Sequence, residues 1–320
     1  MPSTRTDPRA SRELEQKSIA NFCTFSTVEG ADGKPAIQEA FLRINYHCNQ
    51  RCRFSWVDPA FPNLPHDAVV EKIAELGRLG LEWLSFTGGE PTLNGQLAEY
   101  VRLAKECGIR KVTLETNAVR LADVALCQQL GGAGLDAASV SLHAHTAEMS
   151  DKITSAHGTF EKTLRGVFNL IDCNIPVALA FVINTMNYRI IPEFVEFVDA
   201  QLKNLPIVFF FVAPLCVPLL NKKILPRFSD IKESLKKGIN ICIERNITFS
   251  GVAGICGIPP CILDGDMRYY PDLHKVAAQG GGEFDFMKTP ECADCSFDKY
   301  CYGIRRGYVE TYGIDEIHPI

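Results

Sequence analysis

Short apolar runs alternate with longer amphipathic stretches between about residues 40 and 212. Six runs have the length and the β-branched or aromatic content of strands: FLRINY, EWLSF, KVTLE, AASVSL, VALAFVI and IVFFFV. Between them, apolar residues recur every three or four positions, which predicts helices near residues 67–79, 95–107, 121–130, 159–173 and 190–203. Strands separated by helices form a parallel sheet through right-handed crossovers. The pattern therefore predicts an α/β fold, a partial (β/α)6 TIM-like barrel.

Unusual polar or glycine-rich segments follow four of these strands. HCNQRC comes after the first strand, TGGEP after the second, TNA after the third and HAHT after the fourth. In parallel α/β folds the functional residues lie on loops at the carboxyl ends of the strands. We therefore expect the four loops to converge on one face.

The character of the chain changes near residue 215. A proline- and lysine-rich stretch leads into a predicted helix near 229–245, and a tail rich in cysteine and glycine follows. We expect three regions: a partly disordered N-terminal extension over 1–38, the barrel over 39–215, and a C-terminal helix with a small cysteine-rich domain over 216–320.

Composition narrows the classes of function. No apolar run approaches the roughly 20 residues that a membrane span requires, and the polar start of the chain has no apolar segment typical of a secretory signal. A formal net charge of −5 argues against a broad phosphate-binding surface. We expect a cytoplasmic protein with neither a membrane nor a nucleic acid as partner.

The chain has 13 cysteines. Without a secretory signal, so many cysteines favour metal ligation over disulfides. Six of them stand alone or within helical patterns and are expected to be structural: Cys23, Cys107, Cys127, Cys173, Cys216 and Cys242. The others cluster near residue 50 and between residues 256 and 301, where short spacings let one turn present several thiolates to one centre.

The first cluster contains Cys48, Cys52 and Ser55, and FTGGEP follows one strand later at 86–91. These two motifs, in this order, resemble those of the radical S-adenosylmethionine (SAM) family. The resemblance implies a [4Fe-4S] cluster held by three side chains of the first loop, with Ser55 in place of the third cysteine. It also implies that SAM, bound at the open iron, is contacted by the second loop through Gly88, Gly89, Glu90 and Pro91.

Three later segments extend the resemblance. ETNA at 115–118 is similar to the family's TNG segment with alanine in place of glycine, and SVSLH and VINTMNY resemble later strand ends near SAM. The resemblance implies SAM contacts from Asn117, Ser141 and Asn184, although polar residues at strand ends often only cap turns. His143, and also His145, are candidates for proton donation; the alternative for each is a hydrogen-bonded spectator.

Ser55 conflicts with this chemistry. A serine hydroxyl is a poor and mostly protonated iron ligand, whereas a thiol is readily deprotonated by iron. We therefore expect the SAM-binding cluster to be absent, labile or altered. Ser55 is either an introduced change in an ordinary family member, which the retained GGEP favours, or a feature of a natural, degenerate member.

The tail motifs CGIPPC and CADCSFDKYC resemble the auxiliary-cluster extensions of radical SAM maturases, the SPASM and twitch domains. The resemblance implies one auxiliary [4Fe-4S] cluster. Zinc is the rival, because four thiolates also form a closed tetrahedral zinc site. Next to these motifs, Arg305 and Arg306 either bind an anionic substrate or face solvent. The expected cluster ligands are Cys261, Cys292, Cys295 and Cys301, with Cys256 as a substitute for one of them or a free thiol.

The resemblance as a whole implies an oxidoreductase of the radical SAM type. Such an enzyme generates a 5′-deoxyadenosyl radical for hydrogen abstraction, here from a peptide, as in ribosomal natural product maturation, or from a small molecule. It implies an electron donor such as flavodoxin or ferredoxin as a partner. The alternatives are a non-catalytic SAM- or peptide-binding protein on the same fold, and a zinc-stapled α/β protein unrelated to SAM.

Overall fold

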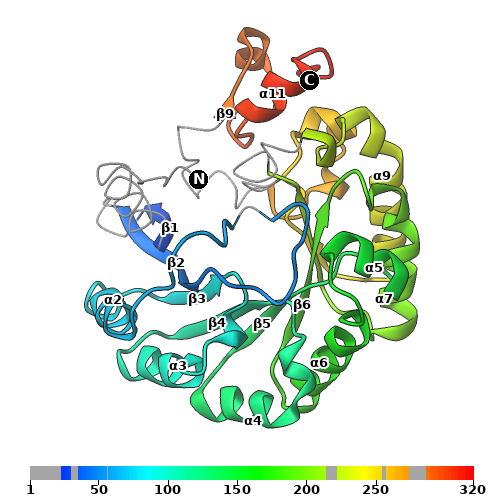
Figure 1. Cartoon of the computed structure of the whole chain (residues 1–320). Coiled ribbons are helices and arrows are strands. Elements are labelled where there is room, and N and C mark those ends of the chain that lie inside the picture. Colours follow the sequence, from blue (N-terminus) through cyan, green and yellow to red (C-terminus); the bar gives the residue numbers. More distant parts are fainter. Residues whose placement is uncertain (1–22, 30–34, 56, 214–221, 254–256, 274–285) are drawn as a thin grey trace, which may run out of the picture.

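A curved eight-stranded sheet forms the centre of the protein, and helices cover its outer side (Figure 1). The computed structural model describes residues 23–29, 35–55, 57–213, 222–253, 257–273 and 286–320. The strands follow one another in sequence order across the sheet. Their bounds are Cys23–Glu29 (β1), Pro35–Asn45 (β2), Trp83–Gly88 (β3), Lys111–Thr116 (β4), Ala137–Ser141 (β5), Val177–Ile183 (β6), Ile207–Phe211 (β7) and Phe249–Ser250 (β8).

Strand β1 pairs antiparallel with β2, and each later strand pairs parallel with the one before it. The partial-barrel α/β fold predicted from the hydrophobic pattern is confirmed, with all six predicted strands in place. The connecting helices are α2 (His66–Arg78), α3 (Leu97–Glu106), α4 (Val124–Ala133), α5 (Ala147–Thr154), α6 (Phe160–Asp172), α7 (Ile191–Gln201) and α9 (Phe228–Glu244).

Five elements differ from the sequence prediction. Strand β1 and the start of β2 lie in the stretch expected to be an extension, and α5 and β8 were not predicted. Helix α2 was predicted near residues 67–79, but it begins at His66, with Pro65 as its N-cap and Asp67 in the first turn. An acidic residue there still favours the helix, because it faces the positive end of the helix dipole.

The two faces of the sheet differ in polarity. On β2, Ala40, Leu42 and Ile44 are fully buried, and they alternate with Glu39 and Arg43, which point the other way. The apolar set packs under the helices and belongs to the hydrophobic core. The polar set therefore faces the concave side of the sheet.

The tail packs against the start of α9. It contains two short paired strands, β9 (Phe286–Met287) and β10 (Ile304–Arg305), and the helix α11 (Arg306–Tyr312). Tyr308 of α11 stacks on Phe228 with ring centroids 4.0 Å apart, and its hydroxyl accepts a 2.8 Å hydrogen bond from the Phe228 amide. This contact ties the tail to the barrel.

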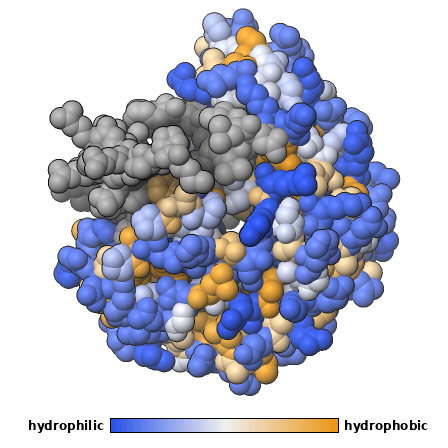
Figure 2. All heavy atoms as spheres, viewed as in Figure 1, coloured by the Kyte–Doolittle hydropathy of each residue, from blue (hydrophilic) through white to orange (hydrophobic). Residues whose placement is uncertain are grey.

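The exposed surface in Figure 2 is mainly hydrophilic over the helices, with smaller apolar areas between them. None of the helices in the described ranges combines the length and apolar character needed to cross a bilayer. The structural role expected for the isolated cysteines agrees with their burial: Cys127 and Cys242 are buried, and Cys107 and Cys173 pack against the core. The side chain of Cys23 and the residue Cys216 lie outside the described part.

Candidate functional site

The loop after β2 carries the first cysteine pair. The Ser55 amide donates to the Cys52 carbonyl at 3.0 Å, which closes a tight turn. The amide of Arg51 donates to the carbonyl of Thr154 at the end of α5 at 2.7 Å. Phe54 contacts the His143 ring edge to face, with centroids 4.7 Å apart. The loop is therefore held from two sides, by α5 and by the segment after β5.

The two thiols lie in different surroundings within this loop. Cys48 is exposed and its sulfur accepts a 3.3 Å hydrogen bond from the Gln50 amide. Cys52 is half-buried, and burial raises the pKa of its thiol to about 12. A thiol with such a pKa stays neutral unless a metal ion binds it. Across the described residues, no three His, Cys, Asp or Glu side chains converge as a ready site for a single metal ion.

The GGEP segment packs directly against this loop. A Cβ on Gly88 would lie 2.2 Å from the Asn45 carbonyl oxygen, and one on Gly89 would lie 2.2 Å from that of His47. Only glycine permits such an approach. The amides of Gly89 and Glu90 donate to the same two carbonyls at 2.9 and 2.8 Å. Pro91 is buried and opens a short 3-10 helix, Pro91–Leu93.

Glu90 joins the second loop to the third. Its buried carboxylate accepts hydrogen bonds from the Thr92 amide (3.0 Å) and hydroxyl (2.5 Å), the Thr116 hydroxyl (2.7 Å) and the Asn117 amide (2.7 Å). Burial raises the pKa of this carboxyl, and the hydrogen bonds oppose that effect. Both carboxylate oxygens are thus engaged within the protein, so Glu90 organises the two loops. Its contact with SAM stays a prediction.

The ETNA segment completes the junction. The Asn117 side-chain amide donates to Asn49 Oδ1 at 2.6 Å and lies 3.6 Å from the sulfur of Cys48. Ala118 adopts the left-handed conformation (φ +58°) that favours glycine. A Cβ on Gly166 of α6 would lie 2.2 Å from the Ala118 carbonyl oxygen. The alanine therefore keeps a glycine-like backbone, and α6 holds it there.

The remaining predicted residues lie at the ends of β5 and β6. Ser141 is partly exposed at the end of β5. Asn184 is fully buried; its Oδ1 accepts from the Met186 amide and its Nδ2 donates to the Val182 carbonyl, both at 2.9 Å. These bonds match the turn-capping alternative for Asn184.

His143 is buried, and its Nδ1 accepts a 3.1 Å hydrogen bond from the Val182 amide. Burial lowers the pKa of His143 to about 3, so the ring is neutral at physiological pH. Its contacts favour the spectator interpretation. His145 is half-buried, and its Nδ1 has no hydrogen-bond partner among the described residues.

Sequence reasoning missed two features of this face. Asn45, at the end of β2, is buried; its Nδ2 donates to the Glu90 carbonyl at 2.9 Å, and its Oδ1, beside Gly88, has no partner among the described residues. The second feature is a polar wall on the concave side of the sheet, where Thr87 donates to Glu115 at 2.6 Å. The signal for both was the alternation of polar residues within the strands.

The polar wall carries charge of both signs. Burial raises the pKa of Glu115, while the charge of Arg43 opposes that rise. Burial and then the charge of Glu115 raise the pKa of Glu39 to about 7, and Lys111 opposes them. The wall therefore presents paired acidic and basic groups to the concave side of the barrel.

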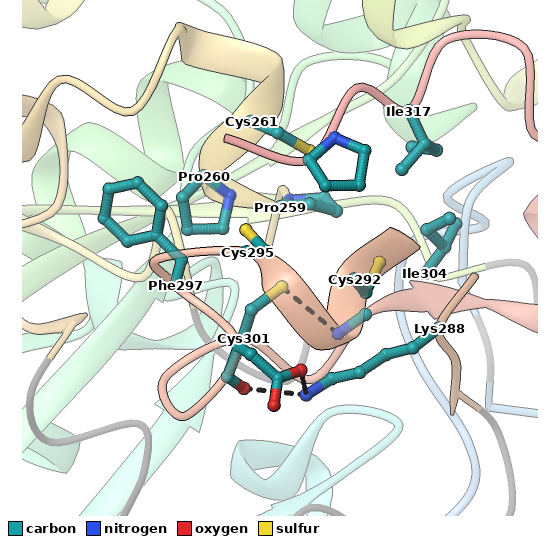
Figure 3. Close-up of a pocket in the computed structure, with 13 residues that line it drawn as sticks. Pro259, Pro260, Cys261, Lys288, Cys292, Cys295, Phe297, Cys301, Ile304 and Ile317 are labelled. Carbon is teal, nitrogen blue, oxygen red and sulfur yellow. Dashed lines mark hydrogen bonds and ion pairs between the residues drawn. The ribbon is translucent and has the colours of Figure 1, made fainter. Parts of the chain in front are cut away.

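The tail cysteines form a second site. Cys261, Cys292, Cys295 and Cys301 line one open cavity, and Figure 3 shows their sulfur atoms distributed around it. The Gly303 amide donates to the Cys301 sulfur at 3.2 Å, and the Thr289 hydroxyl lies 3.5 Å from the Cys292 sulfur. Cys256 lies outside the described residues. Of the two arginines nearby, Arg305 lies over the Phe286 ring and Arg306 is exposed.

Residues 42–198, from β2 into α7, match the sequence model of the Radical SAM superfamily. This region is a radical SAM domain. Its boundaries enclose the cysteine loop, the GGEP segment and the ETNA segment described above.

Curated relatives match about half of the chain. A probable GTP 3′,8-cyclase of Saccharolobus islandicus (strain M.14.25) is 34% identical over 170 residues, which cover 51% of this chain and 53% of the relative. An Fe-coproporphyrin III synthase of Methanosarcina barkeri is 30% identical over 184 residues, 56% of this chain and 44% of the relative. The chain thus matches about half the length of these relatives.

Solved structures share the fold. The native anSMEcpe structure with bound AdoMet and the Kp18Cys peptide has a TM-score of 0.63 at 14% identity, covering 83% of this chain and 89% of that one. Streptococcus suis SuiB bound to S-adenosylmethionine has a TM-score of 0.61 at 14% identity, and the match covers 98% of this chain and 80% of that one.

The radical SAM domain implies a [4Fe-4S] cluster and SAM, and its residues fit the two groups unequally. For SAM, the unpartnered Asn45 Oδ1 beside Gly88 offers an acceptor for an amino group, and the glycines let the second loop pack against the cysteine loop. For the cluster, Cys48 and Cys52 supply two soft donors, but the Ser55 hydroxyl is not an equivalent third. The radical SAM domain therefore fits SAM better than it fits an intact cluster.

Proposed function

We propose that the chain is a radical SAM enzyme whose SAM-binding cluster is compromised by Ser55. The supporting observation is the hydrogen-bonded junction of three strand-end loops. Asn117 reaches Cys48 across 69 positions of sequence, and Glu90 bonds Asn117 across 27. Such a junction brings a thiolate donor, a glycine-rich backbone and polar side chains to one point at the carboxyl ends of parallel strands.

When bound, the cluster and SAM supply hydrogen-abstraction chemistry through a 5′-deoxyadenosyl radical. The chain's own residues prepare the site for it. Gly88 and Gly89 let the second loop pack against the cysteine loop, Asn45 Oδ1 would accept a hydrogen bond from the amino group of SAM, and Glu90 keeps the second and third loops in register. An electron donor such as flavodoxin or ferredoxin is part of the proposal.

The substrate is a peptide or a small molecule that enters the concave side of the barrel. The polar wall of Arg43, Thr87 and Glu115 would bind its polar groups, because both hydrogen-bond donors and acceptors are present there. This balance of charge suits a substrate that carries both donor and acceptor groups, such as a peptide segment, better than it suits a polyanion.

The tail is proposed to hold one auxiliary [4Fe-4S] cluster on Cys261, Cys292, Cys295 and Cys301. Four thiols surround one cavity, yet no three of the metal-binding side chains in the described ranges converge on a single point. Thiols spread around a cavity suit a polynuclear cluster, whereas zinc requires four ligands about 2.3 Å from one ion.

Anaerobic reconstitution of this chain beside its Ser55→Cys and Ser55→Ala forms tests the function. The measurements are iron per chain and the reduced-state EPR spectrum, with and without SAM. Two four-iron clusters give about eight irons per chain and one gives about four. We expect Ser55→Cys alone to gain a cluster whose spectrum shifts with SAM and which yields 5′-deoxyadenosine. If Ser55→Cys gains neither iron nor a SAM response, the chain is not a disabled radical enzyme.

Ser55 itself favours a second candidate, a non-catalytic SAM- or peptide-binding protein on the same fold. The loop junction around Glu90 is complete although the third cluster ligand is a serine. Calorimetric titration with SAM separates the two functions: SAM binding by the given chain, with no cleavage in Ser55→Cys, supports the binding protein.

A further inference from the structure

The segment Ile317–Pro319 lies against the tail cavity. Ile317 and Pro319 line the cavity beside the four cysteines (Figure 3). The backbone amide of His318, between them, approaches the sulfur of Cys261. One short segment thus lines the cavity on the side of Cys261, one of its four thiols.

Hydrogen bonds hold this segment on both flanks. Before it, the Glu316 carboxylate accepts from the Ser229 amide at 2.9 Å and from the Tyr308 hydroxyl. After it, the Ile320 carbonyl accepts from the amide and the hydroxyl of Ser296, at 2.6 and 2.7 Å. Because Ser296 follows Cys295 directly, the segment is fastened to the cysteine loop itself.

The thiols receive matching support on the other side of the cavity. The Gly303 amide donates to the Cys301 sulfur, and Lys288 pairs with Asp298 at 2.7 Å across the loop that carries Cys301. Amide-to-sulfur hydrogen bonds of this kind orient thiolate ligands and tune the centre that they hold.

We propose that Ile317–Pro319 is a fixed cover which, with Cys261 as the fourth thiolate, closes the auxiliary centre. This inference rests on the auxiliary cluster of the proposed function. A centre with four protein thiolates and an apolar cover has no coordination position for a substrate. Its roles are then electron transfer or structural support, and substrate binding is left to the barrel.

The test uses the full chain, reconstituted anaerobically, with Cys48→Ala and Cys52→Ala so that the tail alone holds iron. Cyanide serves as the external ligand, and the reduced-state EPR spectrum is the readout. We expect no change on adding cyanide to this parent, and a cyanide-dependent shift when Cys261→Ala is added. Cys256→Ala is the matched control and should behave like the parent.

The cover is tested by the rate at which a chelator removes iron. Ile317→Asp should increase this rate several-fold, and Ile317→Ala less, while Ile314→Asp, at an exposed position (42%) nearby, should not. Three results would overturn the closed centre. They are a cyanide response in the parent, a spectrum that only Cys256→Ala alters, and equal rates of iron removal for the two Asp variants. Zinc instead of iron in the parent would also overturn the auxiliary cluster. This result distinguishes failure of the proposed cluster from failure of the closed centre alone.

Discussion

Glu39 provides a direct test of the polar wall. It lies on β2 on the same face of the strand as Arg43, in register with Trp83 of β3. Burial, and then the charge of Glu115, raise the pKa of Glu39 from 4.5 to about 7. In the folded protein this carboxyl therefore stays protonated at a pH where it is ionised in the unfolded chain.

The size and sign of the effect follow from linkage. A rise of about 2.5 pKa units corresponds to about 3 kcal/mol at about 1.4 kcal/mol per unit, and we take about 1–2 kcal/mol because the side chain is partly exposed. The folded state binds the additional proton between about pH 4.5 and 7. The free energy of unfolding therefore falls as the pH rises through this window and levels off above it.

Glu39→Gln removes this titration. The difference in unfolding free energy between the variant and the parent should be about 1–2 kcal/mol larger, in favour of the variant, at pH 8 than at pH 5. The reason is that glutamine carries no charge to desolvate. Urea unfolding followed by circular dichroism at both pH values measures the difference. Glu161→Gln, at an exposed position, is the matched control. Identical pH dependence in the parent and in Glu39→Gln would refute the argument.

Three further predictions concern the loop junction. Gly89→Ala should weaken SAM binding at least tenfold by calorimetry, because its Cβ would lie 2.2 Å from the His47 carbonyl oxygen; Gly95→Ala, with open space at its Cβ, should not. Glu90→Gln should cost about 2–4 kcal/mol of unfolding free energy in urea, since an amide replaces a carboxylate that accepts four hydrogen bonds; a loss below 1 kcal/mol would contradict this. With its pKa held at about 3, His143 should give the Ser55→Cys form no inflection in SAM cleavage between pH 5 and 9, and an inflection that disappears in His143→Asn would contradict the spectator role.

The sequence predicts the sheet well because its strands alternate strongly with amphipathic helices. It misses α5, which is short and largely polar, and β8, which has two residues. These elements owe their structure to tertiary contacts, which local periodicity does not report. Strand β1 was missed because it lies within a stretch whose polar start suggested an extension.

The candidate site was predictable only in outline. The glycines of GGEP were expected near a ligand, and the structure adds that they are required by the neighbouring backbone of Asn45 and His47. The engagement of Glu90 depends on partners from another strand end, and the neutral state of His143 depends on burial beneath Phe54. Such features arise from the packing of distant segments, so a motif alone does not contain them.

The opposite polarity of the two sheet faces has a consequence for how this fold can change over time. Most of the apolar surface that stabilises the barrel lies between the outer face and the helices, as at Ala40, Leu42 and Ile44. The concave residues that would meet a substrate contribute less to that core. Mutations there can alter recognition with little loss of folding stability, which makes this scaffold permissive for the evolution of new substrates.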